Sequence, residues 1–247
     1  MKWYILSDLH LCAGRADDHN LEFSKEVLKK AHLEGAGIIL CGDTLDTDQA
    51  HLEDIYLKYR CIFDMFDKFP KERKRIIIGN HDLFLWKYMV ASTDFMNLGV
   101  PQTLIRLNRS VLLYHGHEAD TFCKNPASRA GNWLVGVLEK SIWGNIDKEY
   151  FKLAERVGKL IPAADPFYPG DYSEYKRTAL AYKSQSPDLR LIFQGHTHLL
   201  MDIQCSADLN LIMCGNMCFD NNAKMTEGYV VIDDQTSEYE LVKRECV

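Results

Sequence analysis

Residues 38–43, Ile-Ile-Leu-Cys-Gly-Asp, decide how this sequence folds. The apolar run predicts a buried β-strand, Gly42 permits a tight turn, and Asp43 is presented where the strand ends. The same succession of a short apolar run, a turn and an Asp, Asn or His occurs at residues 3–10, 76–82, 111–117, 191–198 and, less clearly, 209–216. We expect these strand ends to lie together, with Asp43 at their centre.

The first part of the chain alternates predicted strands with predicted helices. We expect strands at residues 3–7, 37–41 and 75–78, and helices at residues 20–34, 52–69 and about 83–91. The helix at 52–69 has the strongest pattern, because apolar side chains recur at steps of three and four residues until Pro70 ends it. Alternating strands and helices are typical of parallel crossover units, whose ligands bind beyond the carboxyl ends of the strands. This half of the chain is therefore predicted to be α/β.

The second half of the chain contains more closely spaced strands. Residues 103–107 and 110–114 are expected to form a hairpin. Later strands are expected at residues 190–194, 199–204, 209–214, 228–233 and 238–243. The last four are close together, which favours antiparallel pairing. Residues from about 118 to 188 carry helical spacings and no convincing strand, so we expect a helical insertion, or cap, within one domain that spans residues 1–247.

Composition and charge narrow the class of protein. The 247 residues are 47% hydrophobic and 26% charged, as is typical of one large globular domain. A net charge of −6 disfavours general binding to nucleic acid, and the basic cluster at residues 71–75 is expected to be a solvated turn. Too few apolar residues precede Ser7 for a signal peptide, and no apolar run approaches the roughly 18 residues of a transmembrane segment. The eight scattered cysteines are typical of reduced thiols, which favours a cytoplasmic location.

Two pairs of potential metal ligands follow predicted strands. Asp8 and His10 are two residues apart, and His196 and His198 repeat that spacing. Side chains two apart at a strand end point to the same side and can reach one ion. Carboxylate and imidazole together suit zinc, manganese or iron, which accept mixed oxygen and nitrogen ligands. Taken alone, Asp8 and His10 are better explained as a surface Asp and a hydrogen-bonded His, whereas two histidines two residues apart at a strand end are a moderate indication of a metal site.

Further donors occupy neighbouring strand ends. Asp43, Asn80 and His115 each follow an apolar run, and six of the nine histidines lie at the ends of four predicted strands. An Asn oxygen is unusual in a structural zinc site but reasonable where a catalytic site keeps an open position. The set as a whole predicts a metal site at the shared edge of the strands.

The order of these residues resembles that of the calcineurin-like metallophosphoesterase family. The family's motif blocks occur in order as Asp8-x-His10, Gly42-Asp43-x-x-Asp46, Gly79-Asn80-His81-Asp82, His115-Gly116-His117 and Gly195-His196-x-His198. The resemblance implies a four-layer α/β/β/α sandwich of two mixed sheets with helices outside. It also implies a phosphoester hydrolase in which two divalent metal ions, manganese in preference to iron or zinc, activate water for in-line attack.

The resemblance also implies residue roles. One metal ion would be held by Asp8, His10 and His198, the other by Asn80, His115 and His196, and both by Asp43. His81 would lie over the phosphate and protonate the leaving oxygen, with Asp46 orienting its imidazole, although Asp46 is equally compatible with a turn residue. Asp82 is expected to cap the helix that follows, and His117 is left open between a contact behind the ligands and a turn residue.

The substrate stays open among phosphodiesters, pyrophosphates and phosphomonoesters. The chain length and the insertion most resemble the UDP-2,3-diacylglucosamine hydrolase subgroup, whose insertion covers acyl chains. That subgroup has Arg at the position of His81, so a lipid-linked nucleotide, which would bring the protein to the membrane surface, stands beside a nucleotide or another small phosphorylated ligand. A scaffold that has lost catalysis is a lower alternative, because no motif residue is missing. The oligomeric state is left open.

Overall fold

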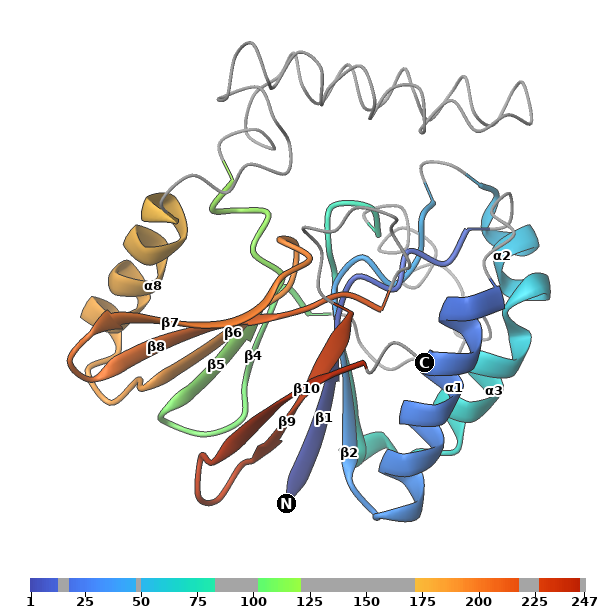
Figure 1. The fold of residues 1–247 in the computed structure, drawn as a ribbon, viewed down its shortest axis with the longest axis horizontal. Helices are drawn as coiled ribbons and strands as arrows, with labels where there is room; N and C mark the ends of the chain where they lie inside the picture. The colour runs from blue at the N-terminus through green and yellow to red at the C-terminus, as the bar shows by residue number, and fades with distance from the viewer. Residues whose placement is uncertain (13–17, 48–49, 83–101, 121–171, 218–226, 245–247) are drawn as a thin grey trace, which may run out of the picture.

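Two five-stranded mixed sheets form the body of the protein (Figure 1). The computed structural model describes residues 1–12, 18–47, 50–82, 102–120, 172–217 and 227–244. The first sheet has the strand order β10-β9-β1-β2-β3. Its strands are β1 (Lys2–Leu6), β2 (Gly37–Cys41), β3 (Lys74–Ile77), β9 (Gly228–Asp233) and β10 (Tyr239–Lys243). Strands β1, β2 and β3 are parallel, whereas β9 is antiparallel to both β1 and β10.

The second sheet has the strand order β4-β5-β6-β8-β7. Its strands are β4 (Leu104–Arg106), β5 (Val111–Tyr114), β6 (Leu191–Gln194), β7 (Leu200–Ser206) and β8 (Leu209–Cys214). The central strands β5, β6 and β8 are parallel, and the two edge strands are antiparallel to their neighbours.

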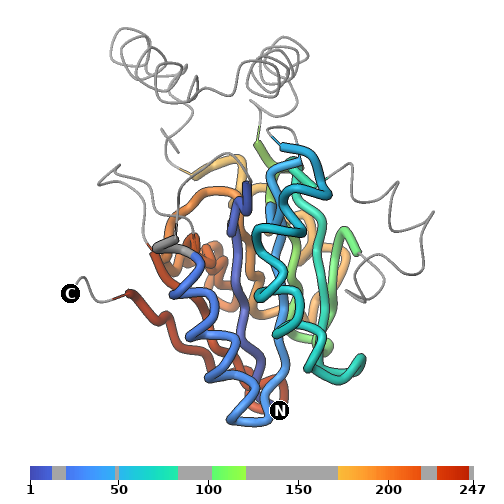
Figure 2. Tube along the Cα trace, turned by 90° about the vertical axis from the view of Figure 1, so that its right-hand side faces the viewer, coloured from blue at the N-terminus to red at the C-terminus, as the bar shows by residue number. Residues whose placement is uncertain are grey.

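Helices cover the outer faces of the two sheets. Helices α1 (Asp18–Leu33), α2 (Leu52–Lys58) and α3 (Arg60–Asp67) lie outside the first sheet, and α8 (Ser173–Gln185) lies outside the second (Figure 1). Figure 2 shows α1 beside α2 and α3 in front of the first sheet. A single 3₁₀ turn, η1 (Lys71–Arg73), leads into β3. This is the four-layer α/β/β/α arrangement that the sequence predicted.

The opening stretch of sequence shows why the central strands are apolar throughout. Along β2, Ile38 and Leu40 pack into the core beneath α1 and α3, whereas Ile39 and Cys41 pack into the core between the two sheets. All four are at most 1% exposed. A strand buried on both faces reads as a continuous hydrophobic run, because successive side chains point to opposite sides. A third core, which contains Leu112, Ala179 and Ile192, joins the second sheet to α8.

The helix predicted at residues 52–69 is in fact two helices. Tyr59 lies between α2 and α3 with φ −106° and ψ 20°, outside helical geometry. Its buried side chain donates a hydrogen bond from the hydroxyl to the carbonyl oxygen of Cys12, at 3.2 Å. That contact ties the junction of the helices to the loop after β1. The apolar stripe continues across the junction through Ile55 and Ile62, so its periodicity does not report the break.

The closely spaced strands near the C-terminus do not form one antiparallel group. Strand β8 is antiparallel to β7 but parallel to β6, and β9 and β10 belong to the first sheet. The β7–β8 and β9–β10 hairpins were predicted correctly. Between β8 and β9 the chain passes from the second sheet to the first, and the spacing of strands along the chain does not reveal this.

The range expected to be an insertion is described only at its two ends. Most of it, residues 121–171, and the helix expected at residues 83–91 lie outside the described residues. Its C-terminal part forms α8, whose buried Ala179 packs against the second sheet, so these residues supply an outer layer of the sandwich. Among the described residues no helix is both long and apolar enough to cross a bilayer.

The basic cluster at residues 71–75 is only partly a solvated turn. Lys74 is 3% exposed, and its Nζ lies 3.0 Å from a carboxylate oxygen of Asp67 and 5.5 Å from the centre of the Phe66 ring. The ion pair and the aromatic face compensate for the burial of this charge. The expectation was wrong for Lys74, because sequence alone does not show such compensating partners.

Candidate metal centre

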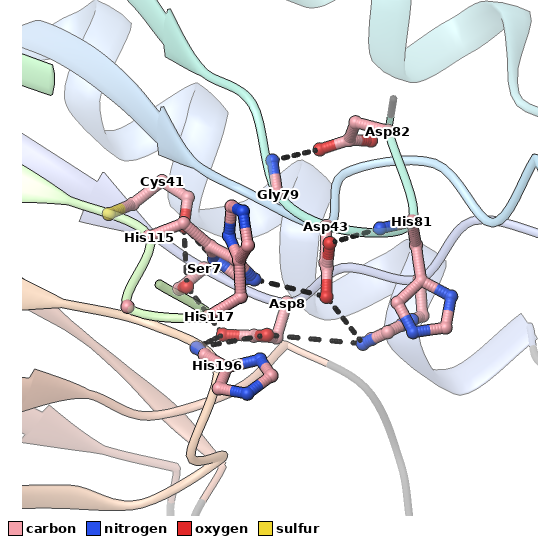
Figure 3. Close-up of polar contacts among 12 residues, drawn as sticks. Ser7, Asp8, Cys41, Asp43, Gly79, His81, Asp82, His115, His117 and His196 are labelled. Carbon is pink, nitrogen blue, oxygen red and sulfur yellow. Dashed lines mark hydrogen bonds and ion pairs between the residues drawn. The ribbon is translucent and has the colours of Figure 1, made fainter. Parts of the chain in front are cut away.

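The donor residues gather at one edge of the sandwich because the parallel strands of both sheets end there. Loops after β1, β2 and β3 carry the donors of the first sheet, and loops after β5 and β6 carry those of the second. Figure 3 shows side chains from these loops pointing toward one another around Asp8 and Asp43. The predicted convergence of the strand ends is therefore present in the fold.

The backbone of this edge adopts a conformation that most residues avoid. Five donor residues have positive φ: Asp8 at 53°, His10 at 45°, Asp43 at 46°, His196 at 68° and His198 at 56°. Among the other described non-glycine residues, only Tyr172 and Ser237 do so. Left-handed backbone is unfavourable for side chains with a Cβ, and such residues gather at functional sites. The clustering independently marks this edge as a site.

One group of donors comprises Asp8, His10 and His198, whose candidate ligand atoms all lie within 4.8 Å of one another. The Nε2 atoms of the two histidines are 3.2 Å apart, and His198 Nε2 is 3.4 Å from Asp8 Oδ1. Asp8 is fully buried, and its Oδ2 accepts hydrogen bonds from the Ser7 hydroxyl at 2.5 Å and the His196 backbone N–H at 3.0 Å. The carboxylate is thereby fixed with Oδ1 toward the imidazoles.

A second group comprises Asp43, His115 and His196, again with ligand atoms within 4.8 Å. His115 donates from Nδ1 to the carbonyl oxygen of Cys41 at 3.0 Å, which turns Nε2 toward Asp43. Nε2 lies 3.1 Å from Asp43 Oδ2, and although burial would lower the pKa of His115, the charge of Asp43 raises it well above its usual range. Among the described residues, the buried Oδ1 of Asn80 has no hydrogen-bond donor. Buried acceptor atoms without a donor are costly, and a cation would satisfy them. The residues present therefore fit a metal ion.

Asp43 lies between the two groups. Its Oδ2 is 3.1 Å from His115 Nε2 and 3.9 Å from His10 Nε2, and its Oδ1 accepts the His81 backbone N–H at 2.8 Å. The chain approaches so closely here that a Cβ on Gly79 would lie 2.0 Å from Asp43 Oδ1. Gly42, at φ +84°, is equally restricted, since its Cβ would lie 2.1 Å from His115 Nδ1.

His81 and Asp46 form a hydrogen-bonded pair beside the donors. His81 Nδ1 lies 3.0 Å from Asp46 Oδ1, and the other oxygen of Asp46 is 3.6 Å from His10 Nδ1. The His81 side chain is 25% exposed, whereas that of Asp46 is 1% exposed. The structure therefore brings the two residues together, with a buried carboxylate hydrogen-bonded to a partly exposed imidazole.

The buried carboxylates differ in charge state because their neighbours differ. Burial alone would raise the pKa of Asp43, but His115 and His81 outweigh it and hold the pKa well below its usual range. Burial would likewise raise the pKa of Asp46, and His81 and His10 lower it. Burial, followed by the charge of Asp43, raises the pKa of Asp82 to about 7, and the backbone hydrogen bonds that it accepts oppose this rise only in part.

Asp82 joins two loops. Its carboxylate accepts hydrogen bonds from the backbone N–H groups of Thr44 at 3.1 Å, Leu45 at 2.8 Å and Gly79 at 3.1 Å. The first two donors follow β2 and the third follows β3. The helix that Asp82 was expected to cap lies outside the described residues.

Two residues that contact the donors were not predicted from the sequence. Ser7 donates a hydrogen bond to Asp8, and Oδ2 of Asp120 lies 2.9 Å from His196 Nε2. Neither residue belongs to a repeated sequence pattern.

The sequence left the role of His117 open. The side chain of His117 is 22% exposed, and its ring centre is 5.5 Å from that of His115. Burial lowers the pKa of His117 to about 4. His117 therefore packs behind a donor as a neutral ring.

Two packed mixed sheets present Asp, Asn and His donors at one edge, an arrangement that suits a metal-dependent active site. A model of the calcineurin-like phosphoesterase family matches residues 1–200, most of the chain, and the chain therefore belongs to that family. It is a metal-dependent phosphoester hydrolase, as the motif order predicted.

Comparison with solved structures found similar chains at low sequence identity. A protein from Pyrococcus horikoshii is 9% identical with a TM-score of 0.53, and the alignment covers 99% of this chain and 88% of that one. An archaeal phosphodiesterase is 14% identical over 99% and 100% of the two chains, with a TM-score of 0.48. A dimetal phosphatase from Danio rerio is 9% identical over 94% and 91%, with a TM-score of 0.49. A search of curated proteins found no match.

Proposed function

We propose that this protein hydrolyses phosphoesters with two divalent transition metal ions held at the edge described above. Asp8, His10 and His198 hold one ion, Asn80, His115 and His196 hold the other, and Asp43 contacts both. Manganese is the proposed metal, with iron and zinc as alternatives, because all three accept mixed oxygen and imidazole ligands. The observation that carries the proposal is the position of Asp43 Oδ2, between His115 Nε2 at 3.1 Å and His10 Nε2 at 3.9 Å.

The arrangement suits hydrolysis of a phosphoester. Divalent ions held there supply Lewis acidity, which lowers the pKa of water and offsets the negative charge of a phosphate. The chain itself fixes the donors in advance: Ser7 orients Asp8, the Cys41 carbonyl orients His115, and the His81 backbone N–H orients Asp43. Donors that are already positioned need no reorganisation during the reaction.

The leaving oxygen of the ester needs a proton, and His81 is the proposed donor. Its imidazole is accessible and belongs to neither proposed ligand group. Asp46 holds Nδ1 at 3.0 Å and so leaves Nε2 for the substrate. A proton held at Nε2 passes to the leaving oxygen as the ester bond breaks, and the Asp46 carboxylate favours the protonated ring that can supply it.

The proposed substrate is a small phosphorylated molecule, whether a phosphodiester, a pyrophosphate or a phosphomonoester. The lipid-linked nucleotide alternative depends on the insertion, most of which lies outside the described residues, and it stays a prediction from resemblance. The scaffold alternative is disfavoured by the complete set of motif residues. A cytoplasmic location is supported by the cysteines among the described residues, which are all free thiols.

Purified protein loaded with Mn²⁺ should hydrolyse bis-p-nitrophenyl phosphate or p-nitrophenyl phosphate, and chelation should abolish the activity. The matched control is Asp8→Asn, which keeps the shape of the side chain but removes a charged donor. A preparation of this variant with undiminished activity would reveal a contaminating phosphatase. Elemental analysis should find two equivalents of metal after reconstitution. The proposal would be refuted if neither ester were hydrolysed, or if no transition metal were bound after reconstitution.

A further inference from the structure

Asp120 contacts one of the proposed ligands without belonging to any motif. It follows His115 by five residues in the loop after β5, whereas His196 lies in the loop after β6. Its Oδ2 is 2.9 Å from His196 Nε2, and the two side chains are 22% and 12% exposed. The contact therefore links neighbouring loops of the second sheet at the site.

This contact determines which ring nitrogen of His196 can bind a metal. A carboxylate oxygen is only an acceptor, so the hydrogen of the neutral imidazole lies on Nε2 and the lone pair lies on Nδ1. His115 is restrained in the opposite sense, because its Nδ1 donates to the Cys41 carbonyl and leaves Nε2 for the ion. Each histidine of the second donor group thus has one nitrogen committed to an acceptor of the protein.

We propose that Asp120 is a positioning residue, which fixes the orientation and tautomer of His196 so that Nδ1 faces the metal ion. The inference rests on the two-metal function proposed above. Such outer contacts orient a ligand and increase its basicity, and losing one typically costs about 10- to 100-fold in metal affinity. The loss should fall on the ion held by Asn80, His115 and His196. The ion held by Asp8, His10 and His198 should keep its affinity.

Three variants of the full chain separate this role from a general structural one. Asp120→Ala removes the acceptor, Asp120→Asn keeps a neutral oxygen that can accept from Nε2, and Asp188→Ala is the matched control on an exposed Asp in the loop before β6. The first readout is Mn²⁺ affinity at each site, from calorimetric titration. The second is the ¹⁵N chemical shifts of the His196 ring in metal-free protein, which report the tautomer directly.

We expect Asp120→Ala to weaken the second Mn²⁺ equivalent by about 10- to 100-fold and to shift the His196 ring away from the Nε2–H tautomer. Asp120→Asn should retain the tautomer and recover most of the affinity, and Asp188→Ala should match the parent protein. Unchanged affinity and tautomer in Asp120→Ala would overturn the inference. The inference would also be overturned if Asp120→Asn kept the tautomer but bound Mn²⁺ as weakly as Asp120→Ala. The carboxylate would then act directly on the ion. If the parent protein binds no second ion, the proposed function fails instead.

Discussion

His81 differs from the other histidines of the site in having a partner that orients it and an exposed edge that remains accessible. Replacing it should therefore remove proton transfer without removing the metal. We predict that His81→Ala lowers turnover by about 10²- to 10⁴-fold, the usual contribution of a general acid, while both equivalents of Mn²⁺ remain bound. Steady-state kinetics with elemental analysis of the same samples measures both quantities.

The matched control for His81 is His51→Ala, because His51 is exposed, immediately precedes α2 and belongs to none of the candidate donor groups. This variant should retain full turnover. If His81→Ala instead loses a metal ion, His81 is a ligand and the leaving oxygen must obtain its proton elsewhere.

The positive φ angles at the donors predict a cost in stability that can be measured at one residue. His198 has φ 56°, a conformation that glycine adopts without strain and alanine does not. In metal-free protein we expect the free energy of unfolding of His198→Gly to exceed that of His198→Ala by about 0.5–1 kcal/mol, although glycine is the more flexible residue when unfolded. Denaturant titration of the two variants measures this difference. Thr197, whose φ is not positive, is the control. There the order should reverse, and the same order at both positions would show that His198 is not strained.

At the scale of elements, the loops after β2 and β3 are held together by the carboxylate of Asp82. Asp82→Ala leaves three backbone N–H groups without this acceptor in a fully buried position. Each unsatisfied buried donor costs about 1–3 kcal/mol. Part of this cost is offset, because the substitution also removes a carboxylate whose charged form is disfavoured by burial. We predict a fall of several degrees in the melting temperature of metal-free protein. Thermal unfolding followed by circular dichroism measures it.

Asp188→Ala, an exposed replacement of the same type, should leave the melting temperature within about a degree. Equal stability of Asp82→Ala and the parent protein would mean that the two loops are held by their other contacts, and that Asp82 contributes only its charge.

The elements that could be predicted from the sequence are those whose pattern is local. The strand at residues 37–41 was predicted because its hydrophobic run is uninterrupted, and the donors were found because they follow such runs. The break at Tyr59 was missed because the apolar stripe runs across it, and the hydrogen bond from Tyr59 to Cys12 joins residues far apart in the sequence. The change of sheet between β8 and β9 was missed because strand spacing carries no information about which sheet a strand joins. Asp120 was missed because its role depends on its contact with His196.

At the scale of the whole molecule, each donor group draws on both sheets. The first sheet supplies Asp8, His10, Asp43 and Asn80, and the second supplies His115, His196 and His198. A metal ion bound by either group therefore connects the two halves of the sandwich. Because the unfolded chain does not assemble these donors, binding should stabilise the fold, by about 2.7 kcal/mol for each site at a free metal concentration 100 times the dissociation constant.

Asp43 is the one proposed ligand common to both groups, and its replacement gives the sharpest test of the whole arrangement. With Asp43→Ala we expect both Mn²⁺ equivalents to be lost and the Mn²⁺-induced rise in melting temperature to disappear. His198→Ala removes a donor from one group only, so it should lose one equivalent and keep part of the rise. Calorimetric titration and thermal unfolding with and without Mn²⁺ measure the two effects. If Asp43→Ala still binds one equivalent as tightly as the parent protein, the two sites are independent and Asp43 serves only one of them, because a shared carboxylate cannot be removed without weakening both.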